Sequence, residues 1–340
     1  METYFRQRFI DELNEEGDIE IRTKVWRRSE ILEMAGHDVF NGLLVDWISA
    51  QRTNARDQVE EFLHENGCLD RFKELVHRYR QGAVIPFVGA GMSCASGHRP
   101  WGDFLKSLLA EAKNYIPDID ALLRANRYEE AAQTVHDILG PKIFAQEIRA
   151  KLGAHKNNVR GPILLLPQIF TQEVVTTNFD YVLTYTYGEA KAPFINTFAG
   201  AALRDAPGRI GNDPHCLLRL HGEAETDHGR VLTAAEYEQT YTQERTLAEL
   251  IAAISGTRSF LFLGCSLTED RTVEALKQSN AKAAVGHAPH YAFLPQPEDD
   301  ERLARRGFLG EAGIQPIYYP PGDHDLMVES LLIALMEGIA

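Results

Sequence analysis

Short apolar runs alternate with longer segments of helical periodicity along most of this chain. Seven runs have the length and composition of buried strands: residues 84–88, 173–177, 193–198, 216–220, 259–264, 290–294 and 315–319. Apolar residues at helical spacing lie between several of these runs, over residues 179–187, 234–254, 269–279 and 299–307, and again over residues 326–336. Strands that alternate with helices are typical of βαβ units, so the pattern predicts an α/β fold with a parallel sheet.

Two further regions are helical in pattern and contain no strand-like run. Residues 1–66 carry three apolar sets at helical spacing, and Gly67 stands where a C-terminal cap is expected. Residues 100–170 separate the first strand from the second and predict a helical insert. We therefore expect an N-terminal helical segment over residues 1–66 and a main domain over residues 67–340.

Composition narrows the class of protein. The chain has 340 residues, of which 44% are apolar and 25% are charged, as in an ordinary globular protein. Its net charge of −14 opposes general binding to nucleic acid. The four cysteines form no C-x-x-C pair, which argues against a zinc ribbon and a disulfide framework. Apolar runs are too short for a signal peptide or a membrane span, so we expect a cytoplasmic protein with no membrane contact.

The first strand ends in a glycine turn, V-I-P-F-V-G-A-G-M-S over residues 84–93. Gly89 and Gly91 allow a tight turn and a close approach of the backbone to a ligand. The N–H groups that follow, together with the hydroxyl of Ser93, then suit a nucleotide phosphate. The motif is incomplete, since Cys94 occupies the place of a third glycine. Such turns also form for packing reasons, so this turn alone leaves both interpretations open.

The second strand ends in T-T-N-F-D, which presents Thr177, Asn178 and Asp180. Ligands of open α/β sheets bind beyond the carboxyl ends of the strands, where these side chains are expected. Helix capping by Asn and Asp is the alternative, and taken alone this motif fits capping better.

Two later strands also end in candidate residues. The sequence L-L-R-L-H-G places His221 at a strand end, where an imidazole can accept or release a proton near neutral pH. The sequence F-L-F-L-G-C-S-L-T-E-D places Gly264 and Ser266 at another, followed by Glu269 and Asp270 as candidate ribose contacts. A plain turn with a helix cap would look similar.

Taken in order, the four segments resemble the sirtuin family over most of residues 84–340. The stretch G-H-R-P-W at residues 97–101 adds to the likeness. The resemblance implies a Rossmann-like domain that binds NAD and carries a small helical module. Its implied site residues are Asn178, Asp180 and His221 around the nicotinamide ribose, Ala90, Gly91 and Ser93 at the phosphates, and Gly264 and Ser266 at the adenosine half.

The chain also departs from the deacetylase members of that family. They carry two C-x-x-C pairs after the His-Gly, whereas residues 223–233 here contain no cysteine. A counterpart of their acyl-lysine-binding strand is also missing. The chain is more similar to the zinc-free branch of bacterial antiphage defence, whose members hydrolyse NAD to nicotinamide and ADP-ribose. This resemblance implies an NAD hydrolase that acts as a toxic effector in abortive infection, with NAD as substrate and without zinc.

The residues suit this reaction because the leaving group of NAD is already cationic and needs no protonation. We expect Asn178 to position the ribose and the attacking water, His221 to act as general base, and Asp180 to orient the ribose hydroxyls. The alternatives are an NAD-dependent deacylase or ADP-ribosyltransferase, which an acetyl-peptide assay would detect, and a nucleotide sensor without catalysis.

The N-terminal segment lies outside the resemblance. We expect it to form a homo-oligomer or to bind a partner, with Trp26 and Trp47 as candidate anchors, although a simple helical cap fits equally well. Sirtuin-like subunits of defence operons resemble partners of HerA-type ATPases or Argonaute-type proteins, and nothing in these residues selects one.

Overall fold

A computed structural model describes residues 2–109, 119–154, 158–204, 206, 215–226, 229–241, 246–268, 271–282 and 288–339. Its centre is a seven-stranded sheet, all parallel, in the order β5-β6-β4-β3-β7-β8-β9. The strands are β3 (Val84–Val88), β4 (Glu173–Thr176), β5 (Asn196–Ala199), β6 (Cys216–Arg219), β7 (Ser259–Leu263), β8 (His290–Pro295) and β9 (Ile314–Tyr319). The predicted α/β fold and all seven predicted strands are confirmed.

The strand order creates a crevice beside β3. From β3 the chain continues to β4 on one side, and it later returns to β7 on the other side. The loops after these strands therefore separate at the carboxyl edge, which is where open α/β sheets bind ligands.

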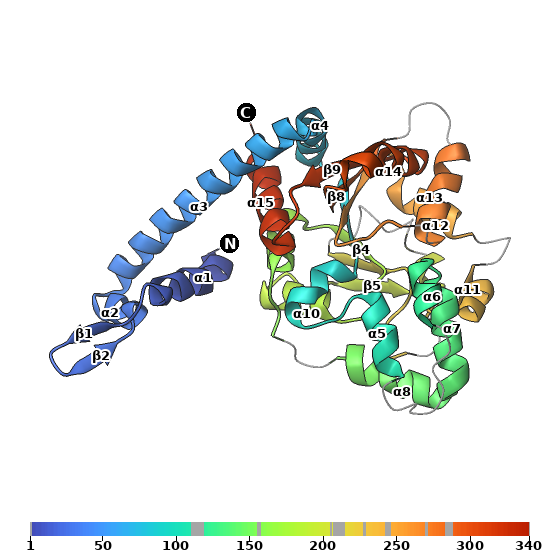
Figure 1. Cartoon of the computed structure of the whole chain (residues 1–340), viewed down its shortest axis with the longest axis horizontal. Coiled ribbons are helices and arrows are strands. Elements are labelled where there is room, and N and C mark those ends of the chain that lie inside the picture. The colour runs from blue at the N-terminus through green and yellow to red at the C-terminus, as the bar shows by residue number, and fades with distance from the viewer. Residues whose placement is uncertain are drawn as a thin grey trace.

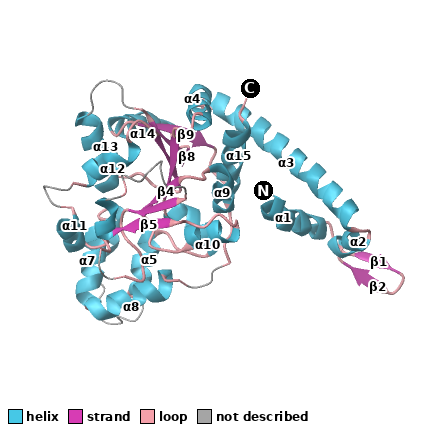
Figure 2. Ribbon diagram, turned by 180° about the vertical axis from the view of Figure 1, so that it is seen from behind, coloured by secondary structure: helices cyan, strands magenta, loops and turns pink. Residues whose placement is uncertain are grey.

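Helices cover the sheet on both faces (Figure 2). The bounds of those beside the sheet are α4 (Leu69–Arg80), η2 (Pro162–Leu165), α9 (Leu166–Ile169), α10 (Val182–Glu189), α12 (Leu247–Ser255), α13 (Arg271–Lys282), α14 (Asp299–Glu311) and α15 (His324–Glu337). The predicted helix over 234–254 is two helices, since α11 (Ala234–Thr240) precedes α12. A short helix, η3 (Gly200–Arg204), follows β5.

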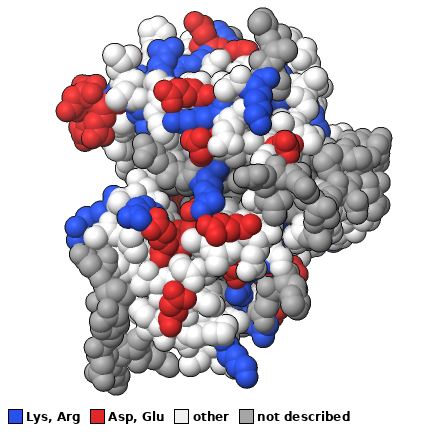
Figure 3. All heavy atoms as spheres, turned by 90° about the vertical axis from the view of Figure 1, so that its right-hand side faces the viewer, with Lys and Arg blue, Asp and Glu red and all other residues white. Residues whose placement is uncertain are grey.

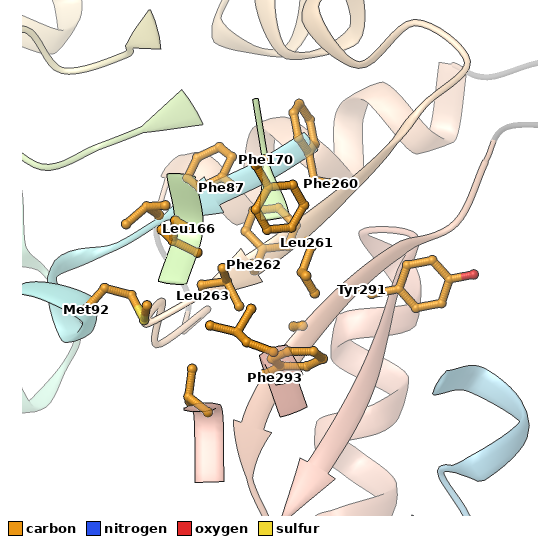
Figure 4. Packing of buried hydrophobic residues seen from close by; sticks show 14 of the residues in the cluster. Phe87, Met92, Leu166, Phe170, Phe260, Leu261, Phe262, Leu263, Tyr291 and Phe293 are labelled. Atoms are coloured by element: carbon orange, nitrogen blue, oxygen red, sulfur yellow. The ribbon is translucent and has the colours of Figure 1, made fainter. Parts of the chain in front are cut away.

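The sheet core is built from strands that are buried on both faces. Phe87 of β3 packs against Phe260 and Phe262 of β7, with ring centroids 5.6 and 4.7 Å apart (Figure 4). Burial on both faces explains why these strands are continuous apolar runs without alternation. Each such side chain contributes about 1.5–3 kcal/mol through burial.

The helical insert has a core of its own. It consists of α5 (Trp101–Leu108), α6 (Ile119–Arg124), α7 (Tyr128–Leu139) and α8 (Pro141–Leu152). Phe104, Leu105, Phe144 and Ile148 are buried in this second cluster, which also takes in Phe179 from the loop after β4. The helices η2 and α9 belong to the sheet core, so the insert packs as α5–α8, a shorter unit than the predicted 100–170.

The N-terminal segment is an extended arm rather than a purely helical unit (Figure 1). It contains α1 (Glu2–Glu15), a hairpin of β1 (Ile19–Ile21) and β2 (Lys24–Trp26), α2 (Arg28–Met34) and α3 (His37–Glu65). The predicted N-terminal helical segment is confirmed, and the hairpin between α1 and α2 is an addition that the sequence pattern did not predict. Its strands have only three residues each, too few for alternation to be visible in the sequence.

The arm is tied to the main body near its base. The side chains of Tyr4 and Arg8 both donate to the buried carboxylate of Glu329 in α15, and Arg52 pairs with Glu337. Buried residues of α1 and α3 belong to the same hydrophobic cluster as the sheet. The domain boundary at residue 66 therefore remains a prediction. Of the helices that the structure describes, none combines the length and apolar character needed to cross a membrane.

Candidate functional site

Four strand ends converge on one cleft of about 330 Å³ at the carboxyl edge of the sheet. The loops after β3, β4, β6 and β7 form the floor of the cleft. The helical insert, α11 and α13 form its wall. The lining includes Gly89, Ala90, Gly91, Cys94, Trp101, Leu105, Tyr128, Glu129, Thr177, Phe179, His221, Leu232, Tyr237, Gly264, Cys265, Ser266, Leu267 and Arg271. Figure 3 shows this side of the molecule, where acidic and basic side chains meet across a hollow.

The twelve predicted site residues fall into three groups. Seven of them line the cleft: Gly89, Ala90, Gly91, Thr177, His221, Gly264 and Ser266. Ser93, Asn178 and Asp180 are buried behind its wall, with 1%, 3% and 6% of their surface exposed. The remaining two, Glu269 and Asp270, lie outside the described residues.

The glycine turn is shaped by packing between two loops. The N–H groups of Gly89 and Gly91 donate to the carbonyls of Leu263 and Gly264, each at 2.9 Å. A Cβ on Gly89 would lie 2.6 Å from the Gly264 carbonyl oxygen, and one on Gly91 would lie 2.9 Å from the Gly264 Cα. These two N–H groups are therefore paired within the protein, and a phosphate contact by the residues that follow the turn remains a prediction. The turn continues into a short 3₁₀ helix, η1 (Ala90–Ser96), whose first residues line the cleft.

Asn178 holds this turn from behind. Its Nδ2 donates to the Gly89 carbonyl at 3.1 Å and to the Ser93 hydroxyl at 3.2 Å, and its backbone N–H donates to the Thr176 hydroxyl at 3.0 Å. Its Oδ1 is buried and accepts no hydrogen bond within the described part of the chain. Buried acceptors are nearly always paired, so this oxygen has hydrogen-bonding capacity that the described residues leave unused.

The Asp180 carboxylate forms a hydrogen bond with the backbone of its own loop. Its Oδ1 accepts the Val182 N–H at 3.0 Å, at the start of α10. This is an Asx turn directly before α10, whose N-cap residue is Tyr181.

A buried arginine, which the sequence analysis did not single out, fixes the same loop. Arg219 of β6 is 1% exposed. Its guanidinium donates to the carbonyls of Asn178 and Asp180 at 3.1 and 2.9 Å, and to the Thr184 hydroxyl at 3.2 Å. Burial lowers its pKa from the usual value. The signal in the sequence was a charged residue inside the apolar run L-L-R-L, where only a well-partnered group is tolerated.

His221 lies on the cleft wall between two aromatic rings. The ring centroid of Phe179 is 6.2 Å away and that of Tyr237 is 5.4 Å away. The Nε2 atom is 2.6 Å from the Tyr237 hydroxyl oxygen. Burial disfavours the charged imidazolium and lowers the pKa of His221 to about 4, so the ring is neutral at pH 7. A neutral imidazole has one nitrogen that can accept a proton.

Tyr237 reaches His221 from the short helix α11, which begins with a capping box. The Thr233 hydroxyl accepts the Glu236 N–H at 3.2 Å, and the Glu236 carboxylate accepts the Thr233 N–H at 2.9 Å. Tyr237 itself is 4% exposed. Because the cap fixes where the helix starts, it also fixes the position of the tyrosine beside the imidazole.

A charged pair joins the insert to the sheet at the exposed side of the cleft. Arg271 of α13 and Glu129 of α7 are 3.1 Å apart, and the Arg271 guanidinium lies 4.9 Å from the centre of the Tyr237 ring. Burial is the main reason that the pKa of Glu129 is raised. All three side chains line the cleft, although their elements are far apart in the sequence.

Metal ligands do not cluster within the described ranges, where no three His, Cys, Asp or Glu side chains are grouped to hold an ion. None of the four cysteines, all of which lie in the described ranges, forms a disulfide bond. Two of them, Cys94 and Cys265, line the cleft, and burial raises the pKa of Cys94.

The crevice, the order of its four segments along the chain and its histidine are similar to those of sirtuin-like proteins. Residues 172–317 match the family model of the SIR2-like domain, so the chain carries such a domain from the start of β4 into β9. The resemblance to the sirtuin family is confirmed.

The chain is also similar to the NAD(+) hydrolase ThsA of Enterococcus faecium. The two are 23% identical over 229 residues, which cover 66% of this chain and 45% of ThsA. The match thus spans less than half the length of that relative.

Proposed function

We propose that this protein hydrolyses the nicotinamide–ribose bond of NAD and releases nicotinamide and ADP-ribose. The observation that carries the proposal is a neutral imidazole, His221, on the wall of a cleft at the switch point of the sheet. The SIR2-like domain and the likeness to an NAD(+) hydrolase support the same substrate.

The reaction balances without a cofactor or a metal. The C–N bond breaks, and its electron pair neutralises the pyridinium nitrogen of nicotinamide. A bond forms between the ribose carbon and the oxygen of water, and one proton is released. His221 takes this proton from water, directly or through a ribose hydroxyl, and passes it to solvent.

Asn178 and Asp180 take different roles in this proposal. Asn178 acts from behind the cleft wall, where its amide holds the glycine turn, and its contact with a ribose hydroxyl or the attacking water remains a prediction. Asp180 acts as a positioning residue, because its carboxylate accepts the Val182 N–H and so fixes the turn that follows Asn178.

Tyr237 contacts the Nε2 nitrogen of His221, and we assign the two ring nitrogens from this contact. The tyrosine hydroxyl occupies Nε2, so the nitrogen that serves as base is Nδ1. Nδ1 has its lone pair only when the ring proton is on Nε2, and that N–H then donates to the Tyr237 oxygen. We therefore assign the ring proton to Nε2, with the Tyr237 oxygen as its acceptor.

To test the proposal, purified wild-type protein and its variants are incubated with NAD, and the rate of nicotinamide release is measured. His221→Ala is expected to lose about 10²–10⁴-fold in rate, and Asn178→Ala to lose activity as well. His64→Ala and Asn54→Ala, at exposed positions of α3, are matched controls that should retain full activity. Wild-type rates in His221→Ala would overturn the proposal.

We further propose that this hydrolysis depletes NAD in a defence response against phage. The support is the resemblance to the zinc-free defence branch. Infected cells that carry the wild-type chain should lose NAD and release fewer phage than cells with His221→Ala. Equal NAD levels in the two infected strains would contradict a role in defence. A HerA-type or Argonaute-type partner remains a prediction.

A further inference from the structure

The lining of the cleft is mainly apolar and carries few charges. Among the described residues that line it, Arg271 is the only lysine or arginine, and Glu129 is the only aspartate or glutamate. The ring of His221 is neutral at pH 7, because burial lowers its pKa to about 4. The described lining therefore offers a ligand one permanent positive charge, and that charge is on Arg271.

Arg271 lies one side chain away from the proposed base. Its guanidinium is 4.9 Å from the centre of the Tyr237 ring, and the Tyr237 hydroxyl oxygen is 2.6 Å from Nε2 of His221. The Arg271 side chain keeps 44% of its surface exposed. A ligand that contacts His221 and extends along the cleft can therefore reach the guanidinium.

The glycine turn has fewer N–H groups to offer a phosphate than its sequence predicts. Those of Gly89 and Gly91 donate to the carbonyls of Leu263 and Gly264. An anionic group in the cleft therefore needs a donor beyond these two. A guanidinium presents several N–H donors in a planar fork, which matches the oxygens of a phosphate in both geometry and charge.

Glu129 occupies part of this fork. The Nε of Arg271 donates to Oε2 of Glu129 at 3.1 Å, and the carboxylate comes from α7 of the helical insert. The Glu129 side chain is 23% exposed, so water and salt screen its charge less than that of Arg271. A carboxylate at this distance repels a phosphate on the same guanidinium. Phosphate binding at Arg271 therefore competes with the ion pair.

Charge also selects which part of a dinucleotide suits Arg271. The nicotinamide ring of NAD is cationic, so a guanidinium repels it, and the riboses and the adenine are uncharged. The diphosphate is anionic and attracts the guanidinium. In NAD a single ribose separates the bond that is cleaved from the first phosphate. That spacing matches a guanidinium that lies one side chain from His221.

We propose that Arg271 binds the diphosphate of the dinucleotide and leaves its ion pair with Glu129 to do so. The inference rests on the proposed function for the identity of the substrate. Arg271 is then a residue that determines specificity for nucleotides with a diphosphate, and Glu129 weakens their binding.

Binding of ADP-ribose tests this assignment without any bond cleavage. ADP-ribose contains the diphosphate and both riboses, and calorimetry with the full-length chain measures its dissociation constant. Arg271→Met should raise this constant about 10–100-fold, because a charge-assisted contact is lost. Arg271→Lys should recover part of the loss, since it keeps the charge but not the fork. Glu129→Gln should lower the constant about threefold or more, because the competing carboxylate is gone.

Arg127→Met is the matched control. Arg127 pairs with Glu130 at the start of α7, and it does not belong to the described lining of the cleft. The variant removes the same charge, and its dissociation constant for ADP-ribose should stay within about twofold of the wild-type value, since exposed ion pairs contribute little. Circular dichroism confirms that each variant is folded.

Nicotinamide riboside, which has no phosphate, separates a substrate contact from a structural role. Arg271→Met should raise KM for NAD about 10–100-fold and leave kcat/KM for nicotinamide riboside within about twofold. Equal losses for the two substrates, an unchanged ADP-ribose constant in Arg271→Met, or no binding of ADP-ribose to the wild type would each overturn the inference. The expected calorimetric shifts in a protein that leaves NAD intact would support the inference and contradict NAD hydrolysis.

Discussion

A general base with a pKa of about 4 gives NAD hydrolysis a pH profile unlike that of an exposed histidine. The pKa of His221 is lowered to this value by burial between Phe179 and Tyr237. Only the neutral ring can accept a proton, so activity is retained at high pH and lost as the pH falls through about 4.

The size of the effect follows from the two pKa values. At pH 5, a histidine with a pKa of about 4 is about 90% neutral, whereas one with the ordinary pKa of about 6.5 is about 3% neutral. At pH 6 the neutral fractions are about 99% and about 24%. The value of kcat/KM at pH 5 should therefore stay within about twofold of its value at pH 8.

The assay measures kcat/KM for nicotinamide release between pH 3.5 and 8.5. Between pH 6.5 and 4 the unfolded chain binds a proton at His221 that the folded chain does not, so stability declines as the pH falls through this window. Circular dichroism at each pH therefore limits the analysis to folded protein. The pKa of Glu129 is also raised, so its titration adds a second transition to the pH profile. Glu129→Gln removes that transition and serves as the control.

A pH profile of kcat/KM with its midpoint near pH 6.5 would refute this assignment, because the imidazole would then be solvated and not enclosed by its aromatic neighbours. A flat profile in the wild type, identical to that of His221→Ala, would refute the assignment of the base.

Three further substitutions test the supporting contacts. Tyr237→Phe keeps the ring but removes the partner of His221, so kcat/KM should fall about 10–100-fold with an unchanged melting temperature; undiminished activity would remove its role. Gly264→Ala should fold poorly in expression trials, because the residue has φ +65° and a Cβ would lie 2.4 Å from the Met92 nitrogen; a normal yield would contradict this. Arg219→Met leaves buried carbonyls unpaired and should cost about 1–3 kcal/mol in urea unfolding, a prediction that wild-type stability would disprove.

Much of the fold could be predicted from the sequence because its strands are short and buried on both faces. Such strands appear as continuous apolar runs, and Gly89 and Gly264 mark where two of them end. The hairpin at residues 19–26 could not be predicted in this way, since its six strand residues are mostly exposed and follow no apolar pattern.

The candidate site was only partly predictable. The convergence of His221 with the glycine turn follows from topology, because parallel strands bring their carboxyl ends to one edge. The places of Tyr237, Glu129 and Arg271 depend on how α11 and the insert fold over that edge, which no local pattern encodes. The sequence also could not show that the Asn178 amide is used on the turn behind the cleft.

The identity of the products tests the central claim most directly. Purified full-length chain is incubated with NAD and an acetylated lysine peptide, and the products are resolved by proton NMR and mass spectrometry. Hydrolysis predicts equal amounts of nicotinamide and free ADP-ribose, with the peptide unchanged and no release by His221→Ala. An acetylated ADP-ribose with a deacetylated peptide, or NAD that is bound but never cleaved, would contradict the account.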